Sequence, residues 1–243
     1  MSNSAPGEQF LASFNRFESW LRSHLGKTQG YPYQRLLEDL RKADELTKSQ
    51  ELQLQTFGYL RNALAHWSPS AEGLAIADPR SDALEEFRAL TELVMAPALV
   101  VDVLGHPTIE CLDYAGRTGD FLALVRDFDF SQAPVLRDGR FAGVLTVGQV
   151  ARWLSEKEWP ARTDFRRAPL ADALKTSIQD PAFICAGRAL TAPEAVNAFS
   201  VSDGGAAISG IVLLDEGDEE DSVLAMVVPS DLPALVGATS WPR

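Results

Sequence analysis

The second half of the chain repeats one order of elements, and this repeat constrains the fold more than any other feature. The first copy alternates short β-rich runs at 99–103, 133–136 and 141–146 with helix-like runs at 119–127 and 147–154. The second copy has strands at 183–186, 210–214 and 223–228, one helix after Thr191 and a last helix from Pro229. The period of about 75 residues is too long for a solenoid unit. This order predicts a pseudo-twofold pair of βαββα modules.

Short signals mark a turn and a helix start within this repeat. Asp138-Gly139, between the last two strands of the first copy, is typical of a two-residue hairpin turn. Thr191 and Glu194 have the spacing of a capping box, in which each side chain satisfies a backbone N–H at the start of a helix.

The two copies also share landmarks around their first helices. Cys111 and then Thr118 precede the helix of one copy, as Cys185 and then Thr191 precede the helix of the other. Threonine is a favoured N-cap residue, so an N-cap role is the plainest reading of both threonines. Two cysteines make neither a disulfide framework nor a metal site, and we expect both to be buried in the core.

The first half has helical periodicity instead. An apolar face from Phe10 to Leu25 predicts a first helix, which Gly26 and Gly30 end. Further helices are predicted at about 33–46, at about 49–66 with a stop at 67–70, and after Ser81 as N-cap. The expected inward residues are Leu36, Leu37, Leu40, Ala43, Leu52, Phe57, Leu60, Leu64, Leu84, Phe87, Leu90 and Val94. Four amphipathic helices with short connections predict a small bundle.

The predicted fold class is therefore α+β. We expect an all-α helical bundle over residues 1–96, followed by the pair of βαββα modules over 97–243. The first module spans about 97–156 and the second about 168–238.

Charge and composition exclude several functions. The net charge of −12 argues against DNA as a partner and disfavours RNA, because affinity for phosphate backbones depends on lysine and arginine. The acidic run at 215–221 is expected to be a solvated loop. No signal peptide or membrane-spanning run is evident, so we expect a cytoplasmic protein without membrane attachment. No histidine pair has metal-ligand spacing and no dinucleotide or phosphate loop is present, so neither a metal nor a prosthetic group is expected.

The repeat resembles a tandem pair of cystathionine-β-synthase (CBS) domains, also called a Bateman module. The residues that carry the resemblance in the first copy are Thr118, 133–140 (Ala-Pro-Val-Leu-Arg-Asp-Gly-Arg) and 143–149 (Gly-Val-Leu-Thr-Val-Gly-Gln). The second copy contributes 210–213 and 225–231, the latter reading Ala-Met-Val-Val-Pro-Ser-Asp. The resemblance implies a cleft between the modules that binds an adenosyl ligand such as AMP, ATP or S-adenosylmethionine.

The family pattern implies a hydroxyl and a carboxylate three residues apart at a helix start, for phosphate and for the ribose diol. Thr146 matches the hydroxyl and Asp231 the carboxylate. Each copy departs from the pattern once, with Gln149 in place of the acid and Val228 in place of the hydroxyl. Gln149 can still accept hydrogen bonds as a weaker neutral group. With Thr118 and Thr191, these residues are the candidate ligand contacts.

The helix predicted at 49–66 ends with Arg61, Asn62 and His66, which resembles the motif of the HEPN superfamily (higher-eukaryote-and-prokaryote nucleotide-binding domains). These domains are helical and usually dimeric, and many are metal-independent ribonucleases. The resemblance implies that Arg61 would hold the scissile phosphate, His66 would act as acid or base, and Asn62 would orient both. Cations in a last helical turn also simply stabilise the helix dipole.

The sequence therefore favours a regulatory, homodimeric adenosyl-nucleotide sensor, in which ligand binding modulates the helical domain. An enzyme is the less favoured reading. One alternative is a HEPN-type metal-independent endoribonuclease controlled by the CBS pair, and another is a dimerisation scaffold that binds no ligand.

Overall fold

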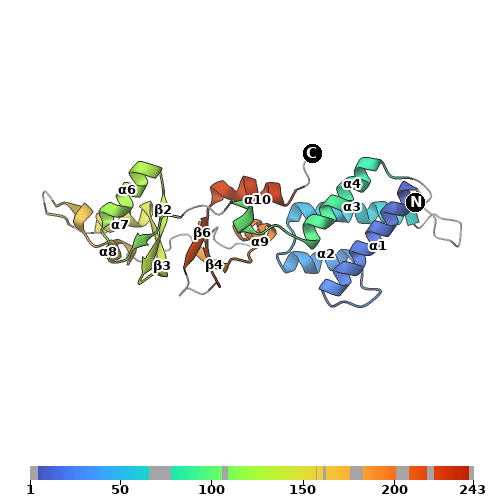
Figure 1. The fold of residues 1–243 in the computed structure, drawn as a ribbon, viewed down its shortest axis with the longest axis horizontal. Coiled ribbons are helices and arrows are strands. Elements are labelled where there is room, and N and C mark those ends of the chain that lie inside the picture. The colour runs from blue at the N-terminus through green and yellow to red at the C-terminus, as the bar shows by residue number, and fades with distance from the viewer. Residues whose placement is uncertain are drawn as a thin grey trace. The chain divides into compact units, whose positions relative to one another are not determined.

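The computed structural model describes residues 5–65, 78–105, 109–156, 158–160, 163–175, 183–200, 208–217 and 222–240, and has a mixed α+β fold (Figure 1). The chain forms two compact units. The first contains Met1–Leu99, Thr191–Asn197 and Pro233–Arg243, and the second contains Val100–Leu190 and Ala198–Leu232. His66, residues 67–70 and part of the acidic run, 218–221, lie outside the described residues. Within the described part, no helix is long and apolar enough to cross a membrane.

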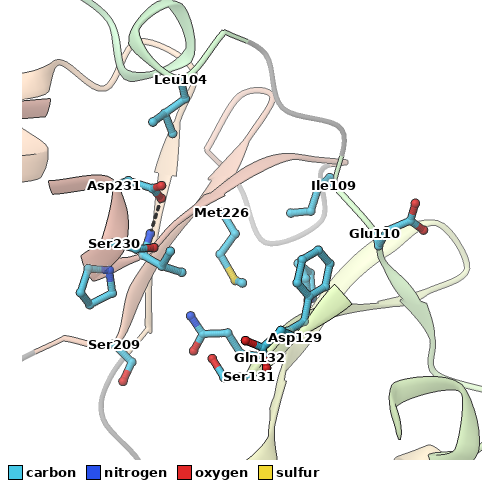
Figure 2. Close-up of a pocket in the computed structure, with 14 residues that line it drawn as sticks. Leu104, Ile109, Glu110, Asp129, Ser131, Gln132, Ser209, Met226, Ser230 and Asp231 are labelled. Carbon is cyan, nitrogen blue, oxygen red and sulfur yellow. Dashed lines mark hydrogen bonds between the residues drawn. The ribbon is translucent and has the colours of Figure 1, made fainter. Parts of the chain in front are cut away.

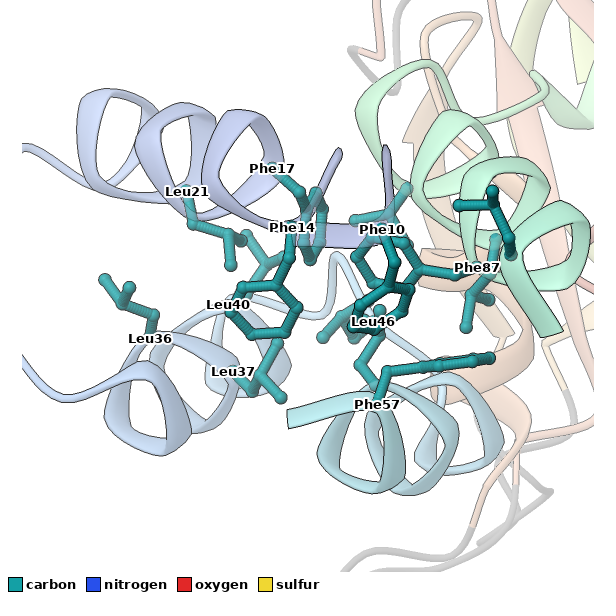
Figure 3. Packing of buried hydrophobic residues seen from close by; sticks show 14 of the residues in the cluster. Phe10, Phe14, Phe17, Leu21, Leu36, Leu37, Leu40, Leu46, Phe57 and Phe87 are labelled. Atoms are coloured by element: carbon teal, nitrogen blue, oxygen red, sulfur yellow. The ribbon is translucent and has the colours of Figure 1, made fainter. Parts of the chain in front are cut away.

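The first unit is built on the helices α1 (Pro6–His24), α2 (Tyr33–Lys42), α3 (Lys48–Ala65) and α4 (Ser81–Met95). Their buried faces meet in an aromatic core (Figure 3). The Phe87 ring centroid lies 5.1 Å from those of Phe10 and Phe57 and 5.7 Å from that of Phe14. Such ring pairs add to the stabilisation that comes from burial alone. The apolar periodicity predicted this core, including Leu36, Leu37 and Leu40.

Two Schellman motifs set the ends of α1 and α2. Gly26 is left-handed, with φ of 62°, as the predicted break requires. Asp44 takes the same conformation after α2, with φ of 61°, and Glu45 N–H donates to Leu40 O at 3.2 Å. The second helix therefore ends at Lys42, and the prediction that it continues to 46 was wrong.

Three smaller predictions for these helices were also wrong. The Leu52 side chain is 52% exposed and Ala43 is exposed, so neither faces the core. Ser81 is the first helical residue, and the N-cap is Arg80. The Asp82 carboxylate accepts the Ala83 N–H at 2.9 Å, which supplies the acceptor expected from Ser81.

The second unit contains two three-stranded sheets of identical connectivity. One consists of β1 (Leu112–Asp113), β2 (Gln132–Arg137) and β3 (Arg140–Thr146), and the other of β4 (Phe183–Gly187), β5 (Gly210–Leu214) and β6 (Val223–Val227). In each sheet the first strand pairs parallel with the second, and the second pairs antiparallel with the third. Each antiparallel pair has one register shift, at Val135/Leu136 and at Leu213/Leu214. The two sheets thus reproduce the order of the sequence repeat.

The predicted hairpin turn is present. Asp138 and Gly139 have φ of 55° and 81°, the two positive values of a type I′ turn. By contrast, the expected β-run at 99–103 is wrong, because α5 (Val100–Val103) is a single helical turn. The only strand-like pairing of this run among the described residues is an isolated bridge from Leu99 to Thr191.

The segment that leads into each repeat pairs with the first helix of the other repeat. Before β4, Pro169 forms an antiparallel bridge with Arg117, at the start of α6 (Thr118–Phe128). Before β1, Leu99 forms the equivalent bridge with Thr191, at the start of α9 (Ala192–Phe199). The helices α8 (Leu170–Leu174) and α5 follow the two bridges. This exchange makes the two repeats interdependent.

The two sheets share a small apolar core. Val144 of β3 packs with Val212 and Leu214 of β5, and all three side chains are buried. Cys185 packs against this cluster but is only half-buried, as is Cys111 next to β1, so the expectation of fully buried cysteines was wrong. Burial, with Glu110 beside it, raises the pKa of the Cys111 thiol, which disfavours a reactive thiolate.

Asn197 of α9 gives a direct test of the first unit. Its buried amide donates to Asp44 O at 3.0 Å and to Leu46 O at 2.8 Å, and so fixes the connection between α2 and α3. We expect Asn197→Ala to lower the free energy of unfolding by about 1–3 kcal/mol, because the buried Leu46 carbonyl and the partly buried Asp44 carbonyl lose their donor. Denaturant unfolding followed by circular dichroism measures the change. Asn15→Ala, on the exposed face of α1, is the matched control and should be neutral or slightly stabilising.

Candidate functional site

A pocket of the second unit lies between the two repeats and has a volume of about 630 Å³ (Figure 2). The first repeat supplies the segment 129–132 and Pro134, and the second supplies Met226 and the segment 228–231. Leu104, Ile109, Glu110 and Ser209 complete the lining. Figure 2 shows Met226 between Asp231 on one side and Ser131 and Gln132 on the other. A volume of this size is typical of small-molecule sites.

The chemistry of the lining is divided among three kinds of group. Apolar side chains come from Leu104, Ile109, Phe130, Pro134, Met226, Val228 and Pro229. Neutral hydrogen-bonding groups come from Ser131, Gln132, Ser209 and Ser230, and carboxylates from Glu110, Asp129 and Asp231. Apolar walls with a few polar groups suit a flat, polar-edged ring such as a nucleobase.

Asp231 is held by the local geometry of the chain. It ends a 3₁₀ turn, Pro229–Asp231, that leads into α10 (Leu232–Ala238), and its Oδ2 accepts the Val228 N–H at 2.9 Å. The carboxylate is thereby fixed at the pocket wall, as the dashed line in Figure 2 marks. Its second oxygen, Oδ1, has no hydrogen-bond partner in the described part of the chain, which leaves it available to a ligand hydroxyl.

Among the described residues of the two repeats, the same cap recurs at four helix starts. In each, a backbone N–H donates to the side chain three residues later, at 2.8–2.9 Å. The pairs are Arg117 with Asp120, Thr146 with Gln149, Thr191 with Glu194, and Val228 with Asp231. Arg117 and Thr191 occupy equivalent positions in the two repeats, as do Thr146 and Val228. The two repeats therefore share these individual hydrogen bonds as well as their order of elements.

These caps also locate the predicted contact residues, of which only Asp231 lines the pocket. Thr146 and Gln149 form a reciprocal capping box, in which Gln149 N–H also donates to Thr146 Oγ1 at 3.1 Å. Thr191 caps α9, and its hydroxyl donates to Glu194 at 2.7 Å. The structure thus brings Thr146, Gln149 and Thr191 together with their capping partners.

Thr118 has a different role from the one that the landmarks suggest. It is the first residue of α6 rather than its N-cap, and its side chain is fully buried. Its hydroxyl donates to Ala168 O at 3.3 Å, in the segment that leads to α8. The expectation that Thr118 is the N-cap equivalent to Thr191 was therefore wrong by one residue, because Arg117 occupies the N-cap position of α6.

Sequence reasoning missed the wall at 129–132. Asp129 is left-handed, with φ of 57°, at the C-cap of α6, and the chain then enters β2. Phe130 lines the pocket and remains 37% exposed, with its ring centroid 5.6 Å from that of Phe128. Two exposed aromatic residues on either side of an aspartate were the available signal, because large apolar side chains at a surface often mark binding sites.

A second pocket, of about 370 Å³, lies in the first unit and is lined by Arg61 and Asn62. Arg61 donates to Asn62 Oδ1 at 3.3 Å, and its guanidinium carbon lies 6.0 Å from the centroid of the Phe14 ring. No ion pair of Arg61 occurs within the described residues. Tyr33, whose pKa burial raises, closes one side and donates to Leu54 O at 3.2 Å. His66, the third member of the motif, lies outside the described residues.

Comparison with known proteins gives distant structural likenesses alone. No family model and no curated protein matches the chain. The solved structures that resemble it are CBS-domain proteins, among them one from Burkholderia ambifaria MC40-6, with 14% identity over 60% of this chain and 98% of that chain and a TM-score of 0.42. CBSX2 in complex with AMP is 10% identical over 58% and 91% of the two chains, with a TM-score of 0.38. CbpB in complex with c-di-AMP is 11% identical over 60% and 85%, with a TM-score of 0.39. At such values the function has to be inferred from the residues of this chain.

Gln149 and Gln132 allow the stability contribution of a helix cap to be compared with that of a pocket residue. We expect Gln149→Ala to lower the free energy of unfolding by about 0.5–1.5 kcal/mol, because the Thr146 N–H loses its acceptor. Gln132→Ala, at the pocket wall, should change stability by less than about 0.5 kcal/mol, because its side chain caps no helix. Denaturant unfolding of both variants checks this difference, and equal losses would contradict the assignment of Gln149 as a cap.

Proposed function

We propose that this protein is a regulatory sensor that binds an adenosyl ligand in the pocket between its two repeats. Residues 97–243 would form a CBS pair and residues 1–96 a HEPN-like helical domain, whose arrangement in a homodimer responds to the ligand. The observation that carries the proposal is the pocket of about 630 Å³ with a fixed carboxylate, Asp231, facing an apolar and hydroxyl-bearing wall.

Each part of an adenosine has a suitable counterpart in this pocket. The Ile109, Phe130 and Met226 side chains supply apolar surface for the adenine ring. The free oxygen of Asp231 can accept from the ribose diol, and a carboxylate is a stronger acceptor than a neutral group. Ser131 and Gln132 lie across the pocket and can meet the polar edge of the base.

Only one such site is supported by the described residues. In the first repeat, the side-chain oxygens of Thr146 and Gln149 each accept the backbone N–H of the other residue in a capping box. In the second, the cap uses one oxygen of Asp231 and leaves the other to the pocket. We therefore infer one adenosyl ligand per chain at the Asp231 pocket.

Asp231→Asn tests the proposal without dismantling the cap, because an amide oxygen performs the same capping role at Gln149. We expect adenosine to bind the variant about tenfold more weakly, since the diol loses a charged acceptor. Isothermal titration calorimetry on the full chain measures the affinity. Glu194→Gln is the control, because Glu194 makes the equivalent cap at Thr191 and does not line the pocket. Failure of adenosine and of every other adenosyl ligand to bind the unaltered protein would overturn the sensor proposal.

The guanidinium of Arg61, which forms no ion pair within the described residues, favours a second function, metal-independent cleavage of RNA by the helical domain. In that case Arg61→Ala should reduce cleavage at least tenfold, because the developing charge on the scissile phosphate loses its cation. The assay is RNA cleavage in the presence of EDTA. Arg35→Ala is the control, because Arg35 is exposed and paired with Glu38 at 2.8 Å. Equal cleavage by both variants would identify a contaminating nuclease, and the net charge of −12 weighs against this function.

A further inference from the structure

The electrostatics of the pocket limit which adenosyl ligands it can accept. Three carboxylates line it, Glu110, Asp129 and Asp231, and its described lining contains no lysine or arginine. None of these carboxylates forms an ion pair with another described residue. The described lining therefore carries three formal negative charges and no lysine or arginine that would offset them.

The helix start beside Asp231 also lacks the groups that bind phosphate. Val228 has no hydroxyl, and Pro229 has no N–H to donate. The Asp231 N–H is already donated to Val228 O at 2.9 Å. Ser230 alone remains as a donor in this turn, whereas a phosphate has several charged oxygens to satisfy.

We propose that the pocket selects adenosyl compounds with an uncharged or cationic tail over nucleotides with phosphate groups. S-adenosylmethionine, whose tail carries a sulfonium, an ammonium and a carboxylate group and is cationic overall, has this chemistry, and AMP and ATP do not. The proposal rests on the sensor function proposed above and names the ligand class of the same site. Opposite charges a few ångströms apart attract strongly where water is partly excluded, and like charges repel.

The acidic wall is fixed by the backbone as well as by side chains. Asp129 occupies the left-handed region, with φ of 57°, and its N–H donates to Val125 O at 3.1 Å. Aspartate and asparagine both tolerate this conformation, so Asp129→Asn removes the charge without straining the chain. Asp138 has nearly the same φ, 55°, in an exposed hairpin turn away from the pocket. Asp138→Asn is therefore a matched control for both backbone and charge.

Four ligands separate charge from shape. Adenosine and AMP differ by a phosphate, and S-adenosylmethionine and S-adenosylhomocysteine differ by the methyl group that makes the sulfur a cation. At low salt we expect adenosine to bind at least tenfold more tightly than AMP, and S-adenosylmethionine about five- to tenfold more tightly than S-adenosylhomocysteine. Both ratios should shrink at high salt, because ions screen partly exposed charges. Calorimetry on the full chain, with EDTA and again with excess Mg²⁺, measures all four.

Variants of the acidic residues then test whether these residues cause the preference for a cationic ligand. Asp129→Asn and Glu110→Gln should each lower the preference for S-adenosylmethionine over S-adenosylhomocysteine at least twofold, and Asp138→Asn should leave it unchanged. Tighter binding of AMP than of adenosine, in either buffer, would overturn this inference and leave the sensor proposal intact. Failure of all four ligands to bind the unaltered protein would overturn the sensor proposal itself, and with it this inference.

Discussion

The packing of Val144 against Val212 and Leu214 joins the two sheets, and the arrangement of the pocket depends on it. These side chains come from β3 and β5, one from each repeat, and all are buried. Burial of three aliphatic side chains is worth several kcal/mol, of order 1.5–3 kcal/mol each. The pocket has one wall in the first repeat, at 129–134, and another in the second, at 226–231. The shared core therefore helps to hold these walls at a ligand-sized separation.

The exchange of leading segments explains why neither repeat is self-contained. Leu170 N–H donates to Gly116 O at 3.0 Å, and Ala192 N–H donates to Ala98 O at 2.8 Å, so each first helix is anchored by chain that leads into the other repeat. The fold therefore needs both copies. A side chain that only caps a helix can be aspartate, glutamate or glutamine, because any side-chain oxygen can accept the backbone N–H.

Much of the fold could be predicted because its signals are local. The aromatic face of α1, the type I′ turn at Asp138 and the capping box at Thr191 each depend on residues within a few positions of one another. The errors in the predicted secondary structure arose where a residue type is compatible with two backbone conformations. Asp44 is compatible with helix continuation and with the left-handed end that it adopts, and the valine-rich run at 100–103 has high β-propensity but forms one helical turn.

The candidate site was harder to predict than the fold for a related reason. Asp231 was found from the sequence because a family pattern marks it, but the opposite wall is a loop between α6 and β2 with no periodicity. Its residues become neighbours of Asp231 only through packing of the two sheets, which sequence spacing does not encode. The sequence could not separate the possible roles of Thr146 and Gln149, because a polar residue at a helix start has the same appearance whether it caps the backbone, binds a ligand or does both.

Asp231 stands at a position in the chain where binding can have consequences beyond the pocket. Two residues later, at Pro233, the chain passes from the unit that contains the pocket into the unit that contains α1–α4. A ligand that engages the free oxygen of Asp231 acts on the residue whose other oxygen already fixes the turn before α10. For a sensor of the proposed kind, regulation then requires that the ligand bind one conformation of this turn more tightly than another. Tight binding with equal affinity for both would shift nothing, so the differential affinity at Asp231 is the quantity that determines whether the pocket regulates.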